Sequence, residues 1–382
     1  MYTPERHGSR YGFEKHSISY DSNKPTSDNV YIDIKVNNDT DSRGVLAKYS
    51  QTRLEPLLSN PSNYYLALVR WKIPGFSLPL LIFPIQNGQG DPNLSEYSVT
   101  LETSTDIVQF YLHFVSYNVP QFPPTTANPT QEPSPYYFIF DYQQMLNILN
   151  DALLNAHNTL TGKPVGSVAP FLIYDPTTKL FSIIATQADY GVDLTPSPIV
   201  PTFDAPIKIY FNFKLFSLFN GFPSRITTEG SVESTQGRDV QILISDYNNA
   251  PLGDNQVIQD FTSISYWSPV KQVVFITELI PANSENTAVS NDSFRKILTD
   301  FEPIPSSNQD VRTTYQYFPQ GQYRLIDMIG TKPLYNIDLQ VKWLDINGNE
   351  YYVTIPPFQQ FTAKMLFVKR NLYKTDNLIF DQ

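Results

Sequence analysis

The segment spanning residues 335–368 carries the strongest structural pattern in the chain. Every second residue from 337 to 343 is apolar and the residues between are polar: Ile337, Leu339, Val341 and Trp343 alternate with Asp338, Gln340 and Lys342. This two-residue period is typical of a strand with one face in a core and the other in water. The polar run at 345–349 suits a hairpin turn, because Asn and Gly tolerate positive φ. Alternation resumes at 351–355, breaks at Pro356 and Pro357, and resumes again at 361–367, so the segment predicts an antiparallel sheet.

The composition is poor in charge and rich in aromatic residues. Charged residues make up 17% of the 382 residues, below the roughly 25% of average soluble domains. The chain contains 25 Tyr, 25 Phe and 31 Pro. This composition resembles that of buried protein–protein contacts, although strands also favour aromatic residues for their own packing. Composition alone leaves both interpretations open.

Charge and cysteine content exclude several classes of protein. The net charge of −10 repels a polyphosphate backbone, so nucleic-acid binding is not expected as the main role. The absence of Cys excludes disulfides, thiolate zinc sites and cysteine nucleophiles. No apolar run approaches 18 residues and no secretion signal opens the chain, so we expect neither a membrane span nor secretion by that route.

The sequence contains no pattern of residues that indicates catalysis, a metal or a cofactor. Of its four histidines, His7 and His16 lie in the N-terminal arm, His113 in an aromatic-rich strand and His157 on the polar face of a helix expected at 141–160. They form no Ser-His-Asp or metal-ligand spacing. The 345–349 turn places Gly348 fourth, whereas a calcium loop needs its Gly sixth. We therefore expect a non-enzymatic protein; a saccharide-binding face of Tyr and Trp remains an alternative.

The chain divides into an arm, a β-domain and an insertion. Residues 1–29 carry as many acidic as basic residues, and their spaced tyrosines suit docking to a partner. Strands are expected through 30–120, and the proline-rich stretch 120–135 indicates a boundary. We assign 30–120 and 291–375 to the β-domain and 121–290 to the insertion. The candidate contact residues are Tyr2, Tyr11 and Tyr20 in the arm, and Trp267 near polar loops.

The insertion contains the one long helix that the sequence predicts. Apolar residues recur at spacings of three and four across 141–160, after the N-cap type Asp141. A hairpin at 171–184 and a short helix at 213–219 should accompany it. Further strands are expected at 207–211, 240–244, 261–267 and 273–276. Trp71 and Trp343 fit buried strand positions instead of contact positions.

Several short motifs resemble structural proteins of small eukaryotic DNA viruses. They include ILTDF (297–301), YRLID (323–327), PL (333–334), ID (337–338), VKW (341–343) and KMLF (364–367), with QTR (51–53), PSNYY (61–65) and LP (78–79) upstream. The set is similar to the jelly-roll minor capsid, or penton, proteins of virophages and polinton-like viruses. The resemblance implies an antiparallel jelly-roll sandwich with an insertion domain facing outward.

The resemblance also implies a function. It predicts a virion structural protein, a minor capsid or penton protein that is assembled inside the host cell. The protein would form pentameric vertices of an icosahedral capsid beside neighbouring major capsid proteins. Two alternatives stay open: a receptor- or glycan-binding attachment protein on a β-sandwich, and a single-jelly-roll major capsid protein. Copy number in the particle would separate the latter from a vertex protein.

Overall fold

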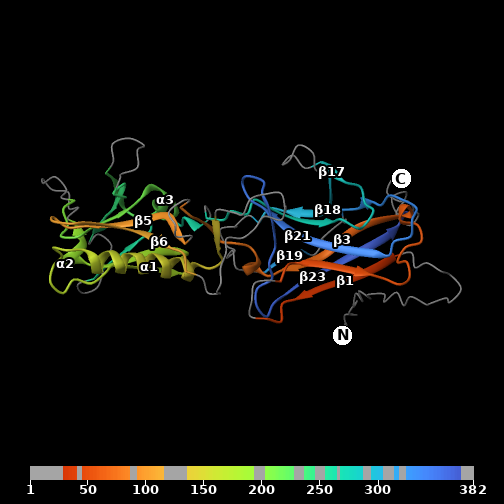
Figure 1. Cartoon of the computed structure of the whole chain (residues 1–382), viewed down its shortest axis with the longest axis horizontal. Coiled ribbons are helices and arrows are strands. Elements are labelled where there is room, and N and C mark those ends of the chain that lie inside the picture. Colours follow the sequence, from red (N-terminus) through yellow and green to blue (C-terminus); the bar gives the residue numbers. More distant parts are fainter. Residues whose placement is uncertain are drawn as a thin grey trace, which may run out of the picture.

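The computed structural model describes residues 29–40, 45–86, 93–115, 136–192, 203–227, 236–245, 254–264, 267–286, 294–303, 314–317 and 324–370. They form two lobes placed end to end along the long axis (Figure 1). One hydrophobic core draws its residues from Ile32 to Leu78 and from Val270 to Phe367. The other draws them from Leu80 to Trp267. We call these the jelly-roll lobe and the insertion lobe.

These cores correct the expected domain boundaries of 120 and 291. Strands β5 (Leu94–Glu102) and β6 (Ile107–His113) were assigned to the β-domain, but they belong to the insertion lobe. Strand β16 (Gln272–Thr277) was assigned to the insertion, but it belongs to the jelly-roll lobe. Alternation identifies a strand without identifying its sheet, which explains the error. The proline-rich stretch 120–135 lies outside the described residues.

The jelly-roll lobe consists of two sheets that face each other across its core. The first has the order β1-β23-β3-β19, with β20 also paired to β3; the second has the order β17-β18-β16-β21-β2, with β22 paired to β21. The chain passes repeatedly from one sheet to the other, as in a jelly roll. The bounds are β1 Asn29–Asn37, β2 Lys48–Thr52, β3 Tyr64–Ile73, β17 Glu285–Asn286, β18 Phe294–Phe301, β19 Tyr315–Tyr317, β20 Ile326–Asp327, β21 Asn336–Leu344, β22 Glu350–Tyr352 and β23 Gln360–Lys369.

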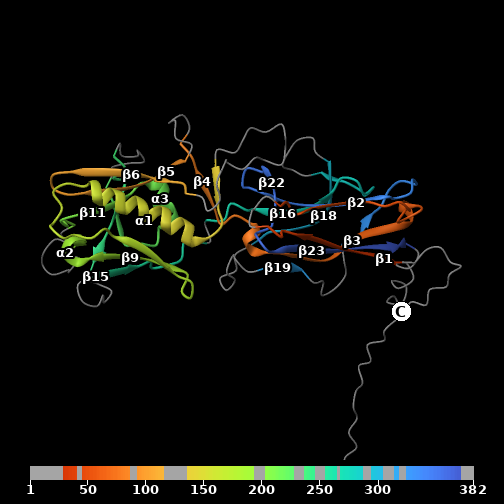
Figure 2. The same cartoon turned by 60° about the horizontal axis from the view of Figure 1, so that its bottom comes forward.

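Strand register gives the jelly-roll lobe a polarity. Asn29 pairs with Val368. The start of β1 and the end of β23 therefore lie side by side at one end of the lobe. At the opposite end, Asn37 pairs with Gln360. There the chain leaves β3, after Ile73, and it returns at the start of β16, which pairs with the end of β21. The insertion lobe therefore lies at the end opposite to Asn29 and Val368 (Figures 1 and 2).

The outer face of β21 differs from the sequence expectation. Ile337, Leu339, Val341 and Trp343 point into the core as predicted. However, Asp338, Gln340 and Lys342 on the other face are also buried, so this face does not lie in water. The Asp338 carboxylate accepts hydrogen bonds from the Thr277 hydroxyl and from the backbone N–H groups of Glu278 and Leu279. Such partners remove most of the penalty of burying a carboxylate.

The insertion lobe packs helix α1 (Tyr142–Thr159) against two sheets. One sheet has the order β12-β13-β11-β5-β6 and the other β15-β9-β8. The helix contacts β5 and β6 of the first and β8 of the second (Figure 2). The remaining bounds are β4 Leu81–Pro84, β7 Tyr136–Ile139, β8 Phe171–Asp175, β9 Leu180–Thr186, α2 Gln187–Tyr190, β10 Gly191–Val192, β11 Lys208–Phe211, α3 Phe213–Leu218, β12 Ser224–Ile226, β13 Val240–Ile242, β14 Ile244–Ser245 and β15 Asp254–Ile258.

Most local predictions for the insertion are confirmed. Asp141 caps α1 by accepting a hydrogen bond from the Gln144 amide, as its side chain suggests. The hairpin β8–β9 and the short helix α3 also lie where they were expected. The expected strand at 261–267 is wrong: its described residues form no strand, and β15 precedes it. Apolar residues of this segment, Ile264 and Trp267, enter the core from a loop. An apolar pattern alone does not distinguish such a loop from a buried strand.

A two-stranded ribbon, β4–β7, joins the two lobes. Leu81, Phe83, Tyr137 and Ile139 point into the insertion core. Phe138 lies between Tyr137 and Ile139 and points the other way, into the jelly-roll core. Its ring centroid lies 5.1 Å from that of Trp343 and 5.3 Å from that of Tyr351. The ribbon therefore contributes one face to each core.

Replacing Trp343 with Ala should lower the free energy of unfolding by about 3–5 kcal/mol, because it leaves a large cavity in the jelly-roll core. Trp343 stacks on Tyr351 with ring centroids 4.4 Å apart and is among the largest fully buried side chains. Denaturant unfolding measures the change, and the exposed Ile346→Ala serves as control. Wild-type-like unfolding of Trp343→Ala would contradict this placement of β21.

Candidate functional site

Of the four residues predicted to contact a partner, the structure describes only Trp267, and it is buried. Tyr2, Tyr11 and Tyr20 lie outside the described residues, so their role stays a prediction. Trp267 is 2% exposed and sits in the insertion core, which corrects its assignment as a contact residue. Its ring stacks on Phe181 at 5.2 Å, and its Nε1 donates to the Leu218 carbonyl at 2.8 Å. A partner has no access to it.

The turn that precedes β23 presents an exposed aromatic ring. Phe358 is 77% exposed and has a φ of 57°, a left-handed conformation that a bulky side chain rarely adopts. The turn closes by a hydrogen bond from the Gln359 amide to the Pro356 carbonyl, 3.2 Å long. Backbone strain of this kind persists only where surrounding contacts impose it.

Asn38 imposes that conformation from the end of β1. This buried side chain donates from Nδ2 to the Ile355 carbonyl at 2.8 Å. Its backbone N–H donates to the Gln359 carbonyl at 2.9 Å. Both sides of the turn are thus fixed to the sheet, and the Phe358 ring projects from a rigid base. A rigid exposed aromatic side chain suits a protein–protein contact.

The neighbouring turn at 345–349 carries a second exposed apolar side chain, Ile346, which is 74% exposed. Asp345 holds the turn, because its Oδ1 accepts hydrogen bonds of 2.8 Å from the amides of Asn347 and Asn349. Gly348 has a φ of 80°. The turn is the hairpin that the sequence predicts, and no cluster of three or more metal-ligating side chains occurs within the described residues.

A charge cluster, with Lys342 buried and Glu350 and Arg295 partly buried, covers part of the outer face of β21. Glu350 forms ion pairs with Arg295 and with Lys342, whose Nζ lies 3.5 Å from Glu350 Oε2. The Lys342 ammonium also lies 5.1 Å from the ring centroid of Tyr352. Burial lowers the pKa of Lys342, and the neighbouring Arg295 guanidinium lowers it further. Two cations therefore share one carboxylate at a partly buried position.

Two basic residues, one in β23 and one directly after it, form ion pairs. Lys364 lies 3.5 Å from Asp33, and its ammonium lies over the Tyr31 ring. Arg370 pairs with Asp327 at 2.9 Å and stacks over Tyr65. Both cations therefore lie beside an acidic side chain and an aromatic ring.

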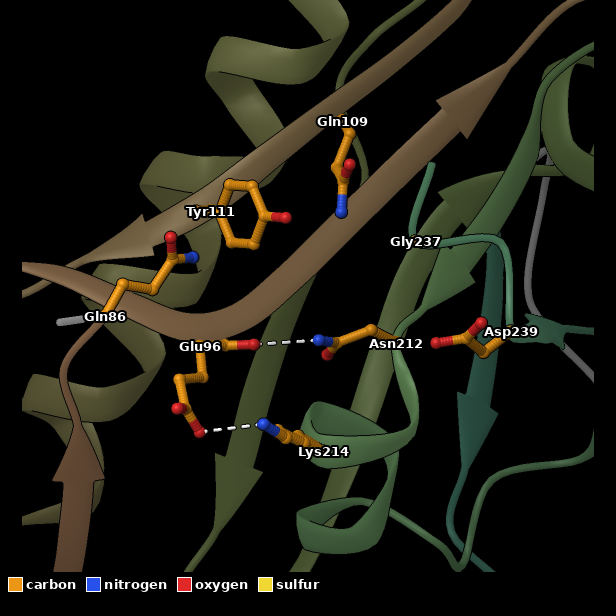
Figure 3. Close-up of a pocket in the computed structure, with 8 residues that line it drawn as sticks. All are labelled: Gln86, Glu96, Gln109, Tyr111, Asn212, Lys214, Gly237 and Asp239. Atoms are coloured by element: carbon orange, nitrogen blue, oxygen red, sulfur yellow. Dashed lines mark hydrogen bonds and ion pairs between the residues drawn. The ribbon is translucent and has the colours of Figure 1, made fainter. Parts of the chain in front are cut away.

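The insertion lobe contains a polar pocket of about 230 Å³ on the sheet face opposite to α1 (Figure 3). Its walls come from five segments, and its lining residues are Gln86, Glu96, Gln109, Tyr111, Asn212, Lys214, Gly237 and Asp239. Gln109 and Tyr111 extend from β6 on one side, and Glu96, Asn212 and Lys214 face them from the other (Figure 3). The pocket thus brings together side chains that lie far apart in sequence.

Asn212 organises the base of this pocket. Its Oδ1 accepts hydrogen bonds from the amides of Ser98 and Leu215, and its Nδ2 donates to the Glu96 carbonyl at 2.8 Å. Lys214 Nζ lies 2.9 Å from Glu96 Oε2. The fold therefore fixes the position of Glu96 through its backbone and through its side chain.

The described histidines, His113 and His157, both lie in the insertion lobe. His157 was expected on the polar face of the helix, but it is buried and its Nε2 lies 3.0 Å from the Ser167 hydroxyl. Burial lowers the pKa of His157, and the nearby Lys163 ammonium lowers it further. His113 lies on β6, near the apolar groove between β6 and α1. Neither His113 nor His157 forms a catalytic arrangement with the other described residues.

A family model described as Sputnik minor capsid protein V18/19 matches residues 30–369. The chain belongs to this minor capsid protein family. It is accordingly a structural component of the virion. Structural protein V19 of Sputnik virophage is 33% identical over 219 residues, covering 53% of this chain and 94% of that protein. Protein V18 of the same virophage is 38% identical over 166 residues, covering 41% of this chain and 96% of that protein.

Two solved structures share the architecture of this minor capsid protein. A chain of the Sputnik virophage particle aligns with a TM-score of 0.69 at 32% identity, covering 91% of this chain and 99% of that one. The mavirus penton protein aligns with a TM-score of 0.55 at 16% identity, covering 89% of this chain and 99% of that one. The similarity to the mavirus penton protein shows the fold alone, and the aligned 89% of this chain includes the insertion lobe.

Sequence reasoning missed both surface features of this minor capsid protein. Phe358 follows two prolines, which were interpreted only as a break between strands. The pocket residues span positions 86 to 239, and no local spacing connects them. Among the described residues, no helix is long and apolar enough to cross a membrane.

Replacing Glu350 with Gln should lower the free energy of unfolding by about 3 kcal/mol, because it leaves Arg295 and Lys342 without their shared carboxylate. Lys342→Met is the matched variant, since it keeps the Arg295–Glu350 pair and removes a charge that is costly to bury. At neutral pH it should be as stable as wild type or more stable.

The pH dependence of Lys342→Met follows from the direction of the pKa shift. Folding lowers the Lys342 pKa. At a pH between the folded and the unfolded pKa of Lys342, the unfolded chain therefore binds more protons than the folded chain, and the stability of wild type rises with pH across this range. The advantage of Lys342→Met should therefore shrink as pH approaches the usual lysine pKa of about 10.4. Denaturant unfolding of the variants near pH 7 and pH 10 measures this. Strong destabilisation by Lys342→Met at neutral pH would contradict it.

Proposed function

We propose that this minor capsid protein forms pentameric rings at the vertices of an icosahedral particle and contacts neighbouring major capsid proteins. The polarity of the jelly-roll lobe is the observation that carries the proposal. The start of β1 and the end of β23 lie at one end, and the insertion lobe occupies the other. An upright subunit with the former end toward the shell would direct the insertion lobe outward. The fold shared with the mavirus penton protein supports the same arrangement.

The role that we propose is structural, with no catalytic step. A closed ring joins one surface patch of each subunit to a different patch of the next, a heterologous contact. Burial of apolar side chains would stabilise that contact by roughly 25 cal/mol per Å², before the cost of association is subtracted. Phe358 is the side chain that we assign to it, because its ring is exposed on a rigid turn. The arm residues Tyr2, Tyr11 and Tyr20 remain candidates for contacts with the shell.

Native mass spectrometry of the full-length chain near neutral pH tests the proposal. The expected species has five times the 43.6 kDa mass of one chain. A monomer or trimer at all protein concentrations would contradict the ring. The copy number in purified particles tests the remaining alternative, because a single-jelly-roll major capsid protein would be the most abundant protein of the shell.

Phe358→Asn should weaken the ring without unfolding the subunit, because Asn tolerates the left-handed backbone that Phe358 adopts. Loss of a central aromatic anchor typically costs about 2 kcal/mol or more. The concentration at half-assembly should therefore rise at least about tenfold. Val165→Asn is the control, since Val165 is fully exposed on the insertion lobe. Unchanged assembly of Phe358→Asn would remove this residue from the contact.

A further inference from the structure

We propose that the polar pocket of the insertion lobe binds a neutral saccharide unit of a surface glycan. This function goes beyond the structural role, because assembly does not require a pocket. Saccharide binding itself does not depend on the ring; only the outward position of the lobe rests on the proposed function.

The first argument is the chemistry of the lining. Sugar hydroxyls both donate and accept hydrogen bonds, so they need neighbouring groups of both kinds. The pocket supplies a carboxylate from Glu96, side-chain amides from Gln86 and Gln109, and a phenol from Tyr111. Among the described residues, no partner hydrogen-bonds the Tyr111 hydroxyl. A few polar groups in fixed positions are what gives a small-molecule pocket its specificity.

The second argument is the exposed ring of Tyr111. Its side chain is 38% exposed and reaches over the hollow from β6 (Figure 3). One face of a pyranose carries C–H groups, and an aromatic ring covers such a face while its polar tip stays available. A wall with an aromatic ring beside hydrogen-bonding groups matches a sugar better than it matches a wholly apolar ligand.

The third argument is preorganisation. Gln109 Nε2 donates to the Ser98 hydroxyl at 2.9 Å, which fixes the amide at the floor. Gly237 approaches the same point with a φ of +66°, and a Cβ there would lie 2.4 Å from Gln109 Nε2 and 2.9 Å from Ser98 Oγ. On the opposite wall, Asp239 accepts from the Phe213 amide at 3.1 Å. Groups held in this way lose little conformational freedom on binding.

The charges of the pocket favour a neutral ligand. Glu96 and Asp239 are acidic, and Lys214, the basic lining residue, already forms an ion pair with Glu96. An anionic group would therefore meet carboxylates at the wall, which disfavours phosphate, sulfate and acidic sugars. A cation would compete with the Lys214 ammonium for Glu96. A neutral hexose avoids both penalties, and a volume of about 230 Å³ accommodates a sugar ring and not a long oligosaccharide.

Glycan-array binding of the full-length chain, followed by saturation-transfer NMR with the methyl glycosides of the neutral sugars that bind, tests the proposal. At least one neutral saccharide should bind, and Tyr111→Ala and Glu96→Gln should each weaken binding tenfold or more. Tyr335→Ala is the matched control, because it removes an exposed tyrosine from the other lobe; it should bind as wild type does. Thermal melting verifies that each variant is folded.

The saccharide site would be overturned if no neutral saccharide binds, or if binding survives in both pocket variants. Preference for acidic glycans would overturn it as well, because it contradicts the charge argument. Native mass spectrometry of the same samples separates this outcome from failure of the vertex proposal. Pocket variants should keep the oligomeric state of wild type whatever their saccharide affinity.

Discussion

The alternation of side chains along the ribbon β4–β7 determines how the two lobes are joined. In a strand, successive side chains point to opposite faces. In this ribbon both faces pack against a core, with Phe83 and Tyr137 buried in one and the partly buried Phe138 against Trp343 and Tyr351 of the other. A shift of one residue in its register would exchange these side chains between the cores. The position of the insertion lobe, and of the pocket that it carries, depends on this pairing.

The outer face of β21 shows what a two-residue period does and does not establish. The pattern at 337–343 correctly identifies the side chains that form the jelly-roll core. It does not establish that the polar face is in water, because Asp338, Gln340 and Lys342 are buried beside partners from other strands. The partners of Asp338 come from residues 277–279, about 60 positions away, whereas Gln340 and Lys342 are paired across the adjoining hairpin by Tyr352 and Glu350. The burial of the second face therefore does not follow from the alternation within β21 itself. A polar face matched by partners in this way favours one strand arrangement, since any other leaves charges buried without partners.

Local features were predictable from the sequence because their causes are local. The N-cap at Asp141, the Asp345 turn and the apolar stripe of α1 each depend on residues within a few positions. The assignment of strands to sheets was not predictable, because β5 and β6 alternate as strands of either lobe would. Trp267 illustrates the same limit. Polar loops around it suggested a contact position, but Phe181, Phe219 and Tyr142 enclose it in the fold.

Because the two lobes have separate cores, substitutions in one lobe leave the packing of the other unchanged. The turn that presents Phe358 is fixed by Asn38 within the jelly-roll lobe. The pocket is fixed by Asn212 and Gly237 within the insertion lobe. Because the cores are distinct, a substitution at the rim of the pocket leaves the packing around Trp343 intact, and sites without shared partners contribute additively to stability. The insertion lobe can therefore acquire a different ligand preference while the jelly-roll lobe keeps the geometry that assembly requires.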